Sequence, residues 1–233
     1  MSGTREHAWA AAGRAAAAEV EDGMRVGLGT GRAAAAGIRA LGERVAGGLR
    51  CTGVPTSRAS DALAREVGIP VGRPGAPLDL AFDGADAVDP DGLVVKGAGG
   101  ALVRERIVAD SAARFLILVD APKMVGSLDA WGALPVAVIP FGAGSVARAL
   151  ADLAPVRRAG RSDDGLVIMD LAVPAGSDWG AVAARVAATT GVVDQGVFHV
   201  TLDRVLIGSP DGGCSTAEAA AAAATIPGWP PPR

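Results

Sequence analysis

Three short segments of the chain carry residue types that can bind an anion and move protons. The first is Gly27–Arg32, whose glycines let the backbone approach an anion and whose following helix would direct its first amides at that anion. The Arg32 guanidinium can add a bidentate contact to a phosphate. Taken alone, such a glycine run is equally consistent with a tight turn that binds nothing.

The second segment, Asp83-Gly84-Ala85-Asp86, places two acidic side chains around a glycine turn. Carboxylates three residues apart can converge on one point, where they suit a divalent metal, proton transfer or hydrogen bonding to sugar hydroxyls. The structural alternative is a turn in which an Asp accepts local backbone hydrogen bonds, and we assign the nearby Asp89–Gly92 to such a turn.

The third segment is Lys96–Gly100, which precedes Glu105 on a predicted helix. By itself, a helix carboxylate such as Glu105 is most often solvated. Together, however, the carboxylates, Lys96 and the loop amides form a set that can abstract a proton next to a carbonyl group. A base removes the proton, Lys96 and the amides stabilise the enediolate oxygen, and an Asp moves the hydroxyl proton. This chemistry needs neither a metal nor a cofactor.

Each segment follows a predicted strand, so one edge of a sheet must position them. Strands are predicted at 24–28, 51–54, 69–71, 78–82, 93–95 and 115–119, and helices at 4–20, 33–45, 57–67 and 102–113. Strands that alternate with helices indicate a mostly parallel sheet covered on both faces. Ligands of such sheets bind outside the carboxyl ends of the strands.

The pattern changes after Trp131. Strands are predicted at 134–139, 166–171, 196–200 and 204–208, and helices at 144–153 and 179–189. Two βαβ-like halves indicate a small split βαβ domain. The predicted fold is therefore α/β, with a Rossmann-like, mostly parallel sheet in residues 1–130 plus 202–233 and an inserted α+β (ferredoxin-like) domain in 131–201. From Ser215 onward we expect a helix fragment and a frayed end.

The composition excludes several classes of protein. The 233 residues include 33 glycines, no tyrosine, four Trp and four Phe, so Ala, Val, Leu and Ile must build the core. A net charge of −3 and scattered aromatic residues offer nucleic acid neither a basic surface nor a stacking platform. Cys51 and Cys214 cannot form a disulfide framework or a structural zinc site. The longest apolar run, 219–226, is too short to cross a bilayer. We expect a cytoplasmic protein without membrane or nucleic-acid partners.

In the three segments described first, the sequence resembles ribose-5-phosphate isomerase type A. The resemblance runs from about Val26 to Gly212. The strongest pieces are Asp83–Asp86 and Lys96–Leu102 with Arg104-Glu105. Supporting pieces are Gly29-Thr30-Gly31, Pro55-Thr56-Ser57, Asp120 with Lys123, Leu134–Val136 with Val138–Pro140, and Gly208–Gly212. Several motifs in the right order are specific, although each alone is weak.

The resemblance implies interconversion of ribose 5-phosphate and ribulose 5-phosphate through an enediolate, by a homodimer or homotetramer without metal or cofactor. Glu105 matches the family's general base. Asp83, Asp86 and Lys96 match residues that contact the sugar hydroxyls and reacting oxygens. The predicted substrate-binding positions are Gly29, Thr30, Gly31, Arg32, Ala33, Gly84, Ala85, Gly97, Ala98, Gly99 and Lys123.

The sequence departs from the family pattern in the phosphate loop, where Arg32 and Ala33 replace a usual Ser-Thr pair. Further departures are Ala87 and Ala137 in place of Glu, Val103 in place of Thr, and Trp9 near the place of a lysine. Two alternatives are kept: the same proton transfer on a different sugar phosphate or related anion, and sugar-phosphate binding without catalysis. A nucleotide-binding dehydrogenase fits poorly, because the first loop lacks a third glycine at Rossmann spacing.

Overall fold

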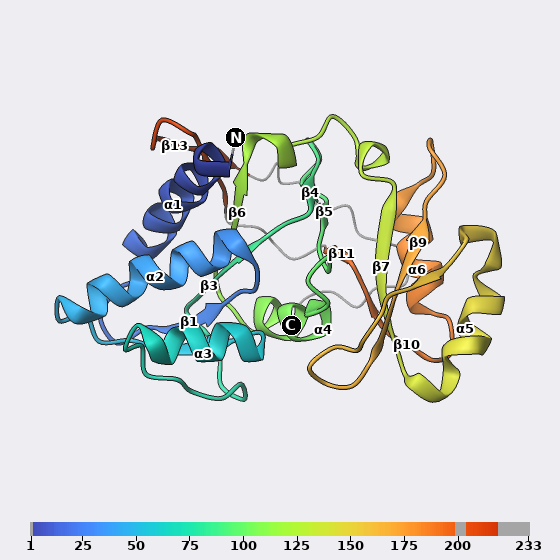
Figure 1. Cartoon of the computed structure of the whole chain (residues 1–233), viewed down its shortest axis with the longest axis horizontal. Helices are drawn as coiled ribbons and strands as arrows, with labels where there is room; N and C mark the ends of the chain where they lie inside the picture. The colour runs from blue at the N-terminus through green and yellow to red at the C-terminus, as the bar shows by residue number, and fades with distance from the viewer. Residues whose placement is uncertain (1, 199–203, 219–233) are drawn as a thin grey trace. The chain divides into compact units, whose positions relative to one another are not determined.

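The computed structural model describes residues 2–198 and 204–218, and contacts divide the chain into two compact units (Figure 1). The first unit comprises the described residues up to Ala85, those from Arg104 to Met124, and the segment 204–218. The second comprises Asp86–Val103 and residues 125–198. The predicted boundary at residue 130 lies near the junction between Met124 and Val125, whereas residues 86–103 group with the second unit. The predicted boundary at residue 201 lies outside the described residues.

A six-stranded sheet in the order β13-β12-β6-β3-β1-β2 forms the centre of the first unit. All neighbouring pairs from β12 to β2 are parallel, and β13 lies antiparallel beside β12. The strands are β1 (Arg25–Leu28), β2 (Thr52–Pro55), β3 (Leu80–Gly84), β6 (Phe115–Asp120), β12 (Arg204–Gly208) and β13 (Cys214–Glu218). The helices are α1 (Ser2–Ala18), α2 (Arg32–Ala46), α3 (Arg58–Glu66) and α4 (Leu102–Asp110), of which α4 begins in the second unit.

Helices cover both faces of this sheet. Ala81 and Phe82 are neighbours in β3, so their side chains point to opposite faces. A Cβ added at Gly27, beside Ala81, would overlap Val108 of α4. On the other face, a Cβ added at Gly37 of α2 would lie 2.7 Å from Cε2 of Phe82. The predicted Rossmann-like sheet is therefore confirmed.

Small residues let the helices of the first unit approach closely. A Cβ added at Gly13 of α1 would lie 2.6 Å from the backbone nitrogen of Gly37 and 2.7 Å from the carbonyl carbon of Ala36. Ala12 and Ala16 of α1 are fully buried in the core of this unit. The alanine and glycine content thus serves a specific contact, in which two helix backbones pack with almost no side chain between them.

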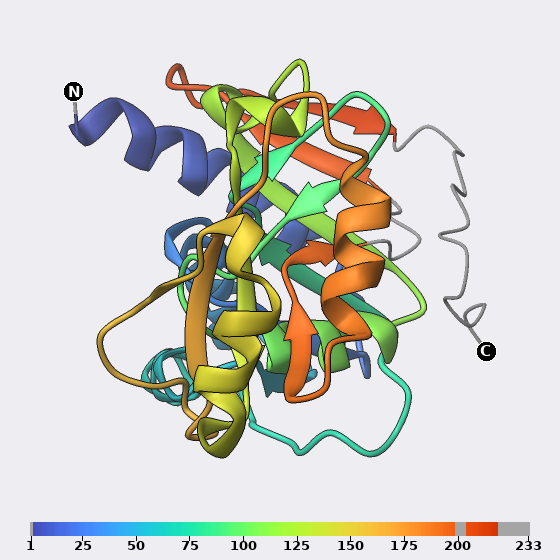
Figure 2. The same cartoon turned by 90° about the vertical axis from the view of Figure 1, so that its right-hand side faces the viewer.

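The second unit contains a four-stranded antiparallel sheet in the order β10-β7-β9-β8. Its chain order is β7 (Ala133–Val138), α5 (Ala143–Ala149), β8 (Val156–Arg157), β9 (Val167–Ala172), α6 (Trp179–Ala187) and β10 (Val192–Gln195). A β-α-β-β-α-β sequence with the last strand beside the first is the ferredoxin-like arrangement, as predicted. Figure 2 views this sheet from the side that α5 and α6 cover.

A three-stranded sheet completes the second unit, in the order β11-β5-β4. Its strands are β4 (Ala87–Val88), β5 (Val94–Val95) and β11 (Val197–Phe198). Short 3₁₀ helices lie at Ala121–Lys123 in the first unit and at Leu128–Ala130, Pro140–Gly142 and Ala151–Leu153 in the second. No helix in the described part of the chain is long and apolar enough to cross a membrane.

Two predicted elements differ in the structure. Residues 69–71 form an isolated bridge between Val71 and Gly53 rather than a strand, because Pro70 has no amide to donate to a ladder. The described beginning of the predicted tail helix is instead strand β13, whose backbone pairs with β12. The rest of the tail and the end of the predicted strand 196–200 lie outside the described residues. The two-residue strands β4 and β8, and β10, were not predicted.

Candidate active site

The carboxyl ends of the parallel strands bring four of the sequence motifs to one edge of the first unit. β1 leads into Gly29-Thr30-Gly31 and β2 into Thr56-Ser57. β3 ends with Asp83-Gly84, and β6 ends at Asp120. The strands are parallel and in register, so these segments lie side by side, as the predicted ligand site requires.

Asp83 fixes the first glycine loop. Its Oδ1 accepts hydrogen bonds from the amide of Thr30 at 2.9 Å and from the amide of Gly84 at 2.7 Å. The residue is 2% exposed. A Cβ added at Gly29 would overlap the Asp83 carboxyl group, so glycine is required at position 29 by close approach. The buried carboxylate and the loop therefore form one rigid piece.

The hydroxyl of Thr30 in the same loop contacts a group of buried hydroxyls. Oγ1 of Thr30 is 2.7 Å from Oγ1 of Thr56 and donates to Oγ of Ser57 at 2.8 Å. Ser57 caps α3 by accepting from the amide of Ser60, and Oγ of Ser60 donates to the carbonyl oxygen of Gly29 at 2.8 Å. Sequence reasoning missed Ser60, although its place three residues after a capping serine is a signal for the first turn of a helix.

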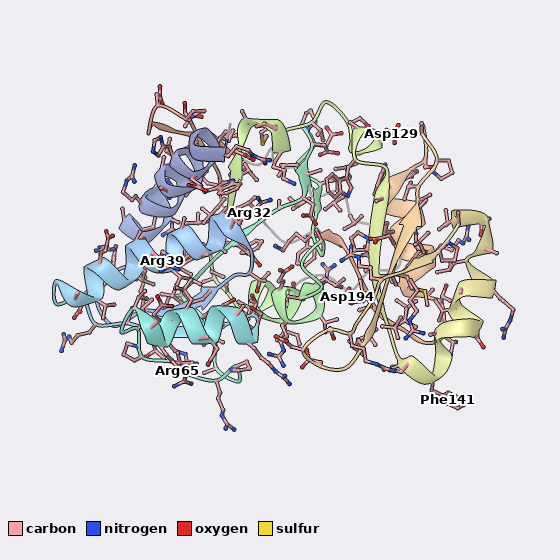
Figure 3. The ribbon with its side chains drawn as sticks, viewed as in Figure 1. Arg32, Arg39, Arg65, Asp129, Phe141 and Asp194 are labelled. Atoms are coloured by element: carbon pink, nitrogen blue, oxygen red, sulfur yellow. The ribbon has the colours of Figure 1, made fainter. Side chains whose placement is uncertain are left out.

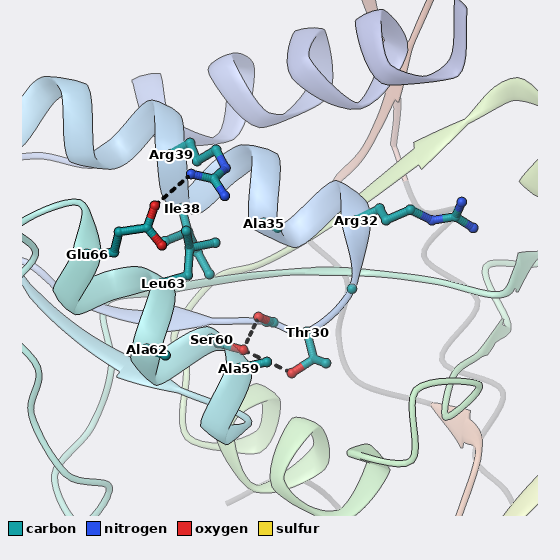
Figure 4. Close-up of a pocket in the computed structure, with 12 residues that line it drawn as sticks. Thr30, Arg32, Ala35, Ile38, Arg39, Ala59, Ser60, Ala62, Leu63 and Glu66 are labelled. Atoms are coloured by element: carbon teal, nitrogen blue, oxygen red, sulfur yellow. Dashed lines mark hydrogen bonds and ion pairs between the residues drawn. The ribbon is translucent and has the colours of Figure 1, made fainter. Parts of the chain in front are cut away.

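A cavity of about 410 Å³ opens between the glycine loop, α2 and α3 (Figure 4). Its lining includes Thr30, Ser60 and the apolar pair Ile38 and Leu63. Arg39 and Glu66 form an ion pair across it at 3.5 Å. Away from the loop, the cavity is therefore lined by apolar side chains and by two charges that compensate each other. The uncharged polar groups of the cavity lie at the loop.

Arg32 begins α2, and its side chain points away from the Arg39–Glu66 pair (Figures 3 and 4). Its guanidinium carbon lies 4.6 Å from the centre of the Trp9 ring, a cation–π contact. Arg5 contacts the same ring at 5.4 Å and donates through Nε to Oδ2 of the buried Asp120 at 2.6 Å. That hydrogen bond raises the pKa of the Arg5 guanidinium. The Trp9 ring therefore holds the Arg32 side chain beside the start of α2.

Glu105 lies in the first turn of α4 and is 4% exposed. The end of α4 is tied to the start of β3, because Ser111 accepts from the amide of Leu78 at 2.8 Å. The helix therefore runs antiparallel to the strands, and its first turn lies toward their carboxyl ends. Glu105 is one turn from Val108, which packs on Gly27, so both share the face toward the sheet.

In the second unit, Asp86 and the second glycine loop are bound to each other. Oδ2 of Asp86 accepts from the amide of Ala98 at 2.8 Å. The loop contains two glycines with positive φ, Gly97 at 109° and Gly100 at 75°. These are conformations that residues with a Cβ rarely adopt.

Lys96 is buried in the second unit. Its backbone amide donates to the carbonyl oxygen of Gly196 at 2.8 Å. The whole residue is only 2% exposed, and its Nζ lies 5.6 Å from the ring centre of Phe198. An Nζ at this distance from an aromatic ring makes a cation–π contact.

The predicted site residues fall into two groups. The first unit holds Gly29–Ala33, Asp83–Ala85, Glu105 and Lys123, and the second holds Asp86, Lys96 and Gly97–Gly99. Lys123 is half-buried and ends the short 3₁₀ helix that follows β6, at the edge where the first group lies. Within the described residues, no group of three or more His, Cys, Asp or Glu side chains could hold a metal ion. Each group separately offers charged atoms and amides suited to an oxygen-rich anion.

The sequence matches known proteins over most of its length. The profile of the family described as ribose 5-phosphate isomerase A (phosphoriboisomerase A) matches residues 52–212. Ribose-5-phosphate isomerase A of Thermomicrobium roseum is 45% identical over 218 residues, which cover 89% of this chain and 92% of that protein. The Deinococcus radiodurans protein of the same name is 42% identical, and the match covers 83% of this chain and 90% of that protein.

Solved structures agree with the sequence match. Ribose 5-phosphate isomerase A from Methanocaldococcus jannaschii superposes with a TM-score of 0.83 at 34% identity, covering 90% of this chain and 97% of that one. A D-ribose-5-phosphate isomerase in complex with phospho-erythronic acid superposes with a TM-score of 0.85 at 31% identity. The match covers 92% of this chain and 99% of that one. The similarity therefore includes both units of the fold.

Proposed function

The chain belongs to the ribose-5-phosphate isomerase A family and is an isomerase, and from this premise we propose how its residues interconvert ribose 5-phosphate and ribulose 5-phosphate. In the proposed reaction Glu105 is the general base. It takes the proton from the carbon next to the sugar carbonyl and returns it to the neighbouring carbon, with an enediolate between the two steps. The observation that carries the proposal is a buried carboxylate, Glu105, in a helix turn near the carboxyl ends of the strands.

The charge of the enediolate needs stabilisation on its oxygens. We assign this to the buried Lys96 ammonium and to the amides of Gly97 and Gly99 in the loop after it, since the Ala98 amide already donates to Asp86. Preorganised charges and amides of this kind stabilise an oxyanion. Asp83 and Asp86 are the groups that move the hydroxyl protons. Each already accepts a hydrogen bond from a loop amide, which fixes the direction of its carboxylate.

The phosphate would bind at the first glycine loop, with Lys123 as a further contact. The loop leads into the 15-residue helix α2, which begins at Arg32, and the amides of Arg32 and Ala33 lie at its N-terminus, which attracts anions. Arg32 supplies the cation, which compensates for the hydroxyls that the usual Ser-Thr pair would provide. A related isomerase binds phospho-erythronic acid, a phosphorylated anion of similar size, which supports a sugar phosphate as the ligand. The proposal includes a cytoplasmic homodimer or homotetramer that needs no cofactor.

The direct test measures conversion of ribose 5-phosphate by the wild type, by Glu105→Gln and by Glu43→Gln. Removal of a general base costs roughly 10²- to 10⁴-fold in rate, and Glu105→Gln should show that loss. Glu43 is exposed on α2, so its variant should be as fast as the wild type. If Glu105→Gln isomerised the sugar at the wild-type rate, another group would be the base.

The Arg32-Ala33 pair motivates a second candidate, the same reaction on a different sugar phosphate. The double variant Arg32→Ser/Ala33→Thr restores the usual hydroxyls. If the natural substrate is ribose 5-phosphate, wild type and double variant should turn it over at similar rates. A gain of roughly tenfold or more in kcat/KM in the double variant would favour another natural substrate.

A further inference from the structure

The side chain of Arg158 makes four hydrogen bonds within the second unit, and no motif in the sequence marks this residue. It directly follows β8, and its amide donates to the carbonyl oxygen of Ile168 at 2.9 Å. Its Nε and Nη2 donate to the two carboxylate oxygens of Asp170 on β9, at 2.7 and 2.5 Å. Its Nη1 donates to the carbonyl oxygens of Gly97 and Ala98, at 2.7 and 2.9 Å.

The bidentate pair with Asp170 fixes the plane of the guanidinium. Both residues are partly buried, with side chains 25% and 33% exposed. The remaining nitrogen, Nη1, is therefore held at a set place above the loop. A lysine, with a single flexible ammonium group, could not reproduce a fork that binds a carboxylate and two carbonyls together.

One peptide group lies between Arg158 and Asp86. The carbonyl of Gly97 and the amide of Ala98 belong to the same planar peptide and point in opposite directions. The carbonyl accepts from Arg158, and the amide donates to Oδ2 of Asp86 at 2.8 Å. A cation at one end and a carboxylate at the other therefore hold this peptide in a single orientation.

The loop needs such a restraint because its sequence, Gly97-Ala98-Gly99-Gly100, has little conformational preference of its own. A rotation of the 97–98 peptide would remove the hydrogen bond that orients the Asp86 carboxylate. The 97–98 peptide makes one hydrogen bond with the Arg158 cation and one with the Asp86 carboxylate, so both are charge-assisted. Each bond polarises the peptide in the direction that strengthens the other. The orientation of the Asp86 carboxylate therefore depends on the conformation of this loop.

We propose that Arg158, held by Asp170, is a positioning residue that acts on the reaction through the 97–98 peptide and Asp86. The proposal rests on the function proposed above, in which Asp86 moves a hydroxyl proton. Arg158 itself does not contact the reacting atoms in this account. Its removal should therefore lower kcat more than it raises KM.

The test compares Arg158→Met, Arg158→Lys and Asp170→Asn with the control Arg161→Met. Arg161 lies three residues further along the same segment and donates to the carbonyl oxygen of Gly165. We expect Arg158→Met to lower kcat roughly 10²-fold, as a misplaced catalytic group does, with Arg158→Lys and Asp170→Asn between it and the wild type. Arg161→Met should keep the wild-type kcat. Equal kcat values in Arg158→Met and Arg161→Met would overturn the proposal.

A double-mutant cycle separates positioning from a general structural role. In the Asp86→Asn background, Arg158→Met should lower kcat by less than about threefold, because the group on which it acts is already lost. A full roughly 10²-fold loss in that background would show that Arg158 acts by another route and would overturn the proposal. Thermal unfolding of every variant identifies those that fail to fold, and Arg158→Lys and Asp170→Asn then carry the test.

The amide resonance of Ala98 gives a readout that does not depend on the substrate. In ¹⁵N-labelled protein, Arg158→Met and Asp86→Asn should each shift this resonance and speed its hydrogen exchange, while Arg161→Met should leave both unchanged. An unchanged Ala98 amide in Arg158→Met would refute the positioning role even in an active enzyme. If the wild type fails to isomerise ribose 5-phosphate while the amide responds as expected, only the proposed function fails.

Discussion

At the scale of single residues, Arg32 is positioned by an aromatic ring, and no acidic side chain in the described part of the chain forms an ion pair with it. The Trp9 ring holds the guanidinium 4.6 Å from its centre, while the cation stays exposed at the start of α2. An arginine paired with a carboxylate would have its charge compensated. Stacking instead leaves the nitrogen atoms able to donate to an anion, which suits a phosphate contact.

This arrangement predicts graded effects on binding. Arg32→Ala should raise KM for the sugar phosphate about tenfold or more, since hydrogen bonds to a charged group contribute roughly 1.5–3 kcal/mol. Trp9→Ala should raise KM about two- to fivefold, because the exposed cation–π contact contributes about 0.5–1 kcal/mol. Steady-state kinetics measure both, and kcat should change little. Arg39→Ala, which breaks the ion pair of the pocket, is the control for a change of charge. A KM unchanged by Arg32→Ala would exclude Arg32 from the phosphate site.

At the scale of secondary-structure elements, α3 supports the glycine loop through its capping residue. Oγ of Ser57 accepts from the amide of Ser60 and also from the hydroxyl of Thr30. The helix start and the loop therefore share one hydroxyl group. Loss of that group should affect both stability and the loop.

We expect Ser57→Ala to lower the free energy of unfolding by about 1 kcal/mol, the usual effect of losing an N-cap. Urea denaturation monitored by circular dichroism measures this. Ser145→Ala, which changes an exposed serine on α5, should leave the midpoint unchanged. Equal midpoints for Ser57→Ala and the wild type would show that the cap contributes nothing to the fold.

The elements were the most predictable part of the molecule, and the contacts between distant elements the least. The strands before Gly29 and Asp83 could be predicted because a short apolar run meets a turn residue there. Asp83, Asp86 and Lys96 were proposed as site residues because charged residues at the ends of predicted strands are chemically informative, and Glu105 because it follows the second glycine loop. Arg158 and Trp9 carried no such signal, since the partners that give them a role lie far away in sequence. Strand β13 was missed because alanine favours helix, whereas pairing with β12 determines its structure.

At the scale of the whole molecule, a group of ion pairs connects the end of α1 to the central sheet of the first unit. Oε2 of Glu19 accepts from Arg114 at 2.9 Å and from Arg204 at 2.8 Å. Arg114 directly precedes β6, and Arg204 begins β12. One carboxylate thus joins three segments that are distant in sequence.

These ion pairs predict how stability depends on pH. The hydrogen bond from Arg114, together with Arg204, lowers the pKa of Glu19 below its usual value. A lowered pKa means that the folded state favours the ionised form, so the stabilisation is present above the unfolded pKa, near 4.3, and is lost as pH falls further. Glu19→Gln should therefore be less stable than the wild type by about 1 kcal/mol at pH 7. The difference should shrink below about pH 4 in urea denaturation. A difference that stays constant from pH 7 to pH 3 would contradict this account.

The central claim for the molecule is that the isomerisation is a proton transfer by Glu105. It is tested most directly by conversion of ribose 5-phosphate in D₂O, with the position of deuterium in the sugar followed by NMR. Repeated interconversion by the wild type should introduce solvent deuterium at the carbon atoms that exchange the proton, and Glu105→Gln should slow this introduction roughly 10²- to 10⁴-fold. A Glu105→Gln variant that forms product and incorporates deuterium as fast as the wild type would contradict the account.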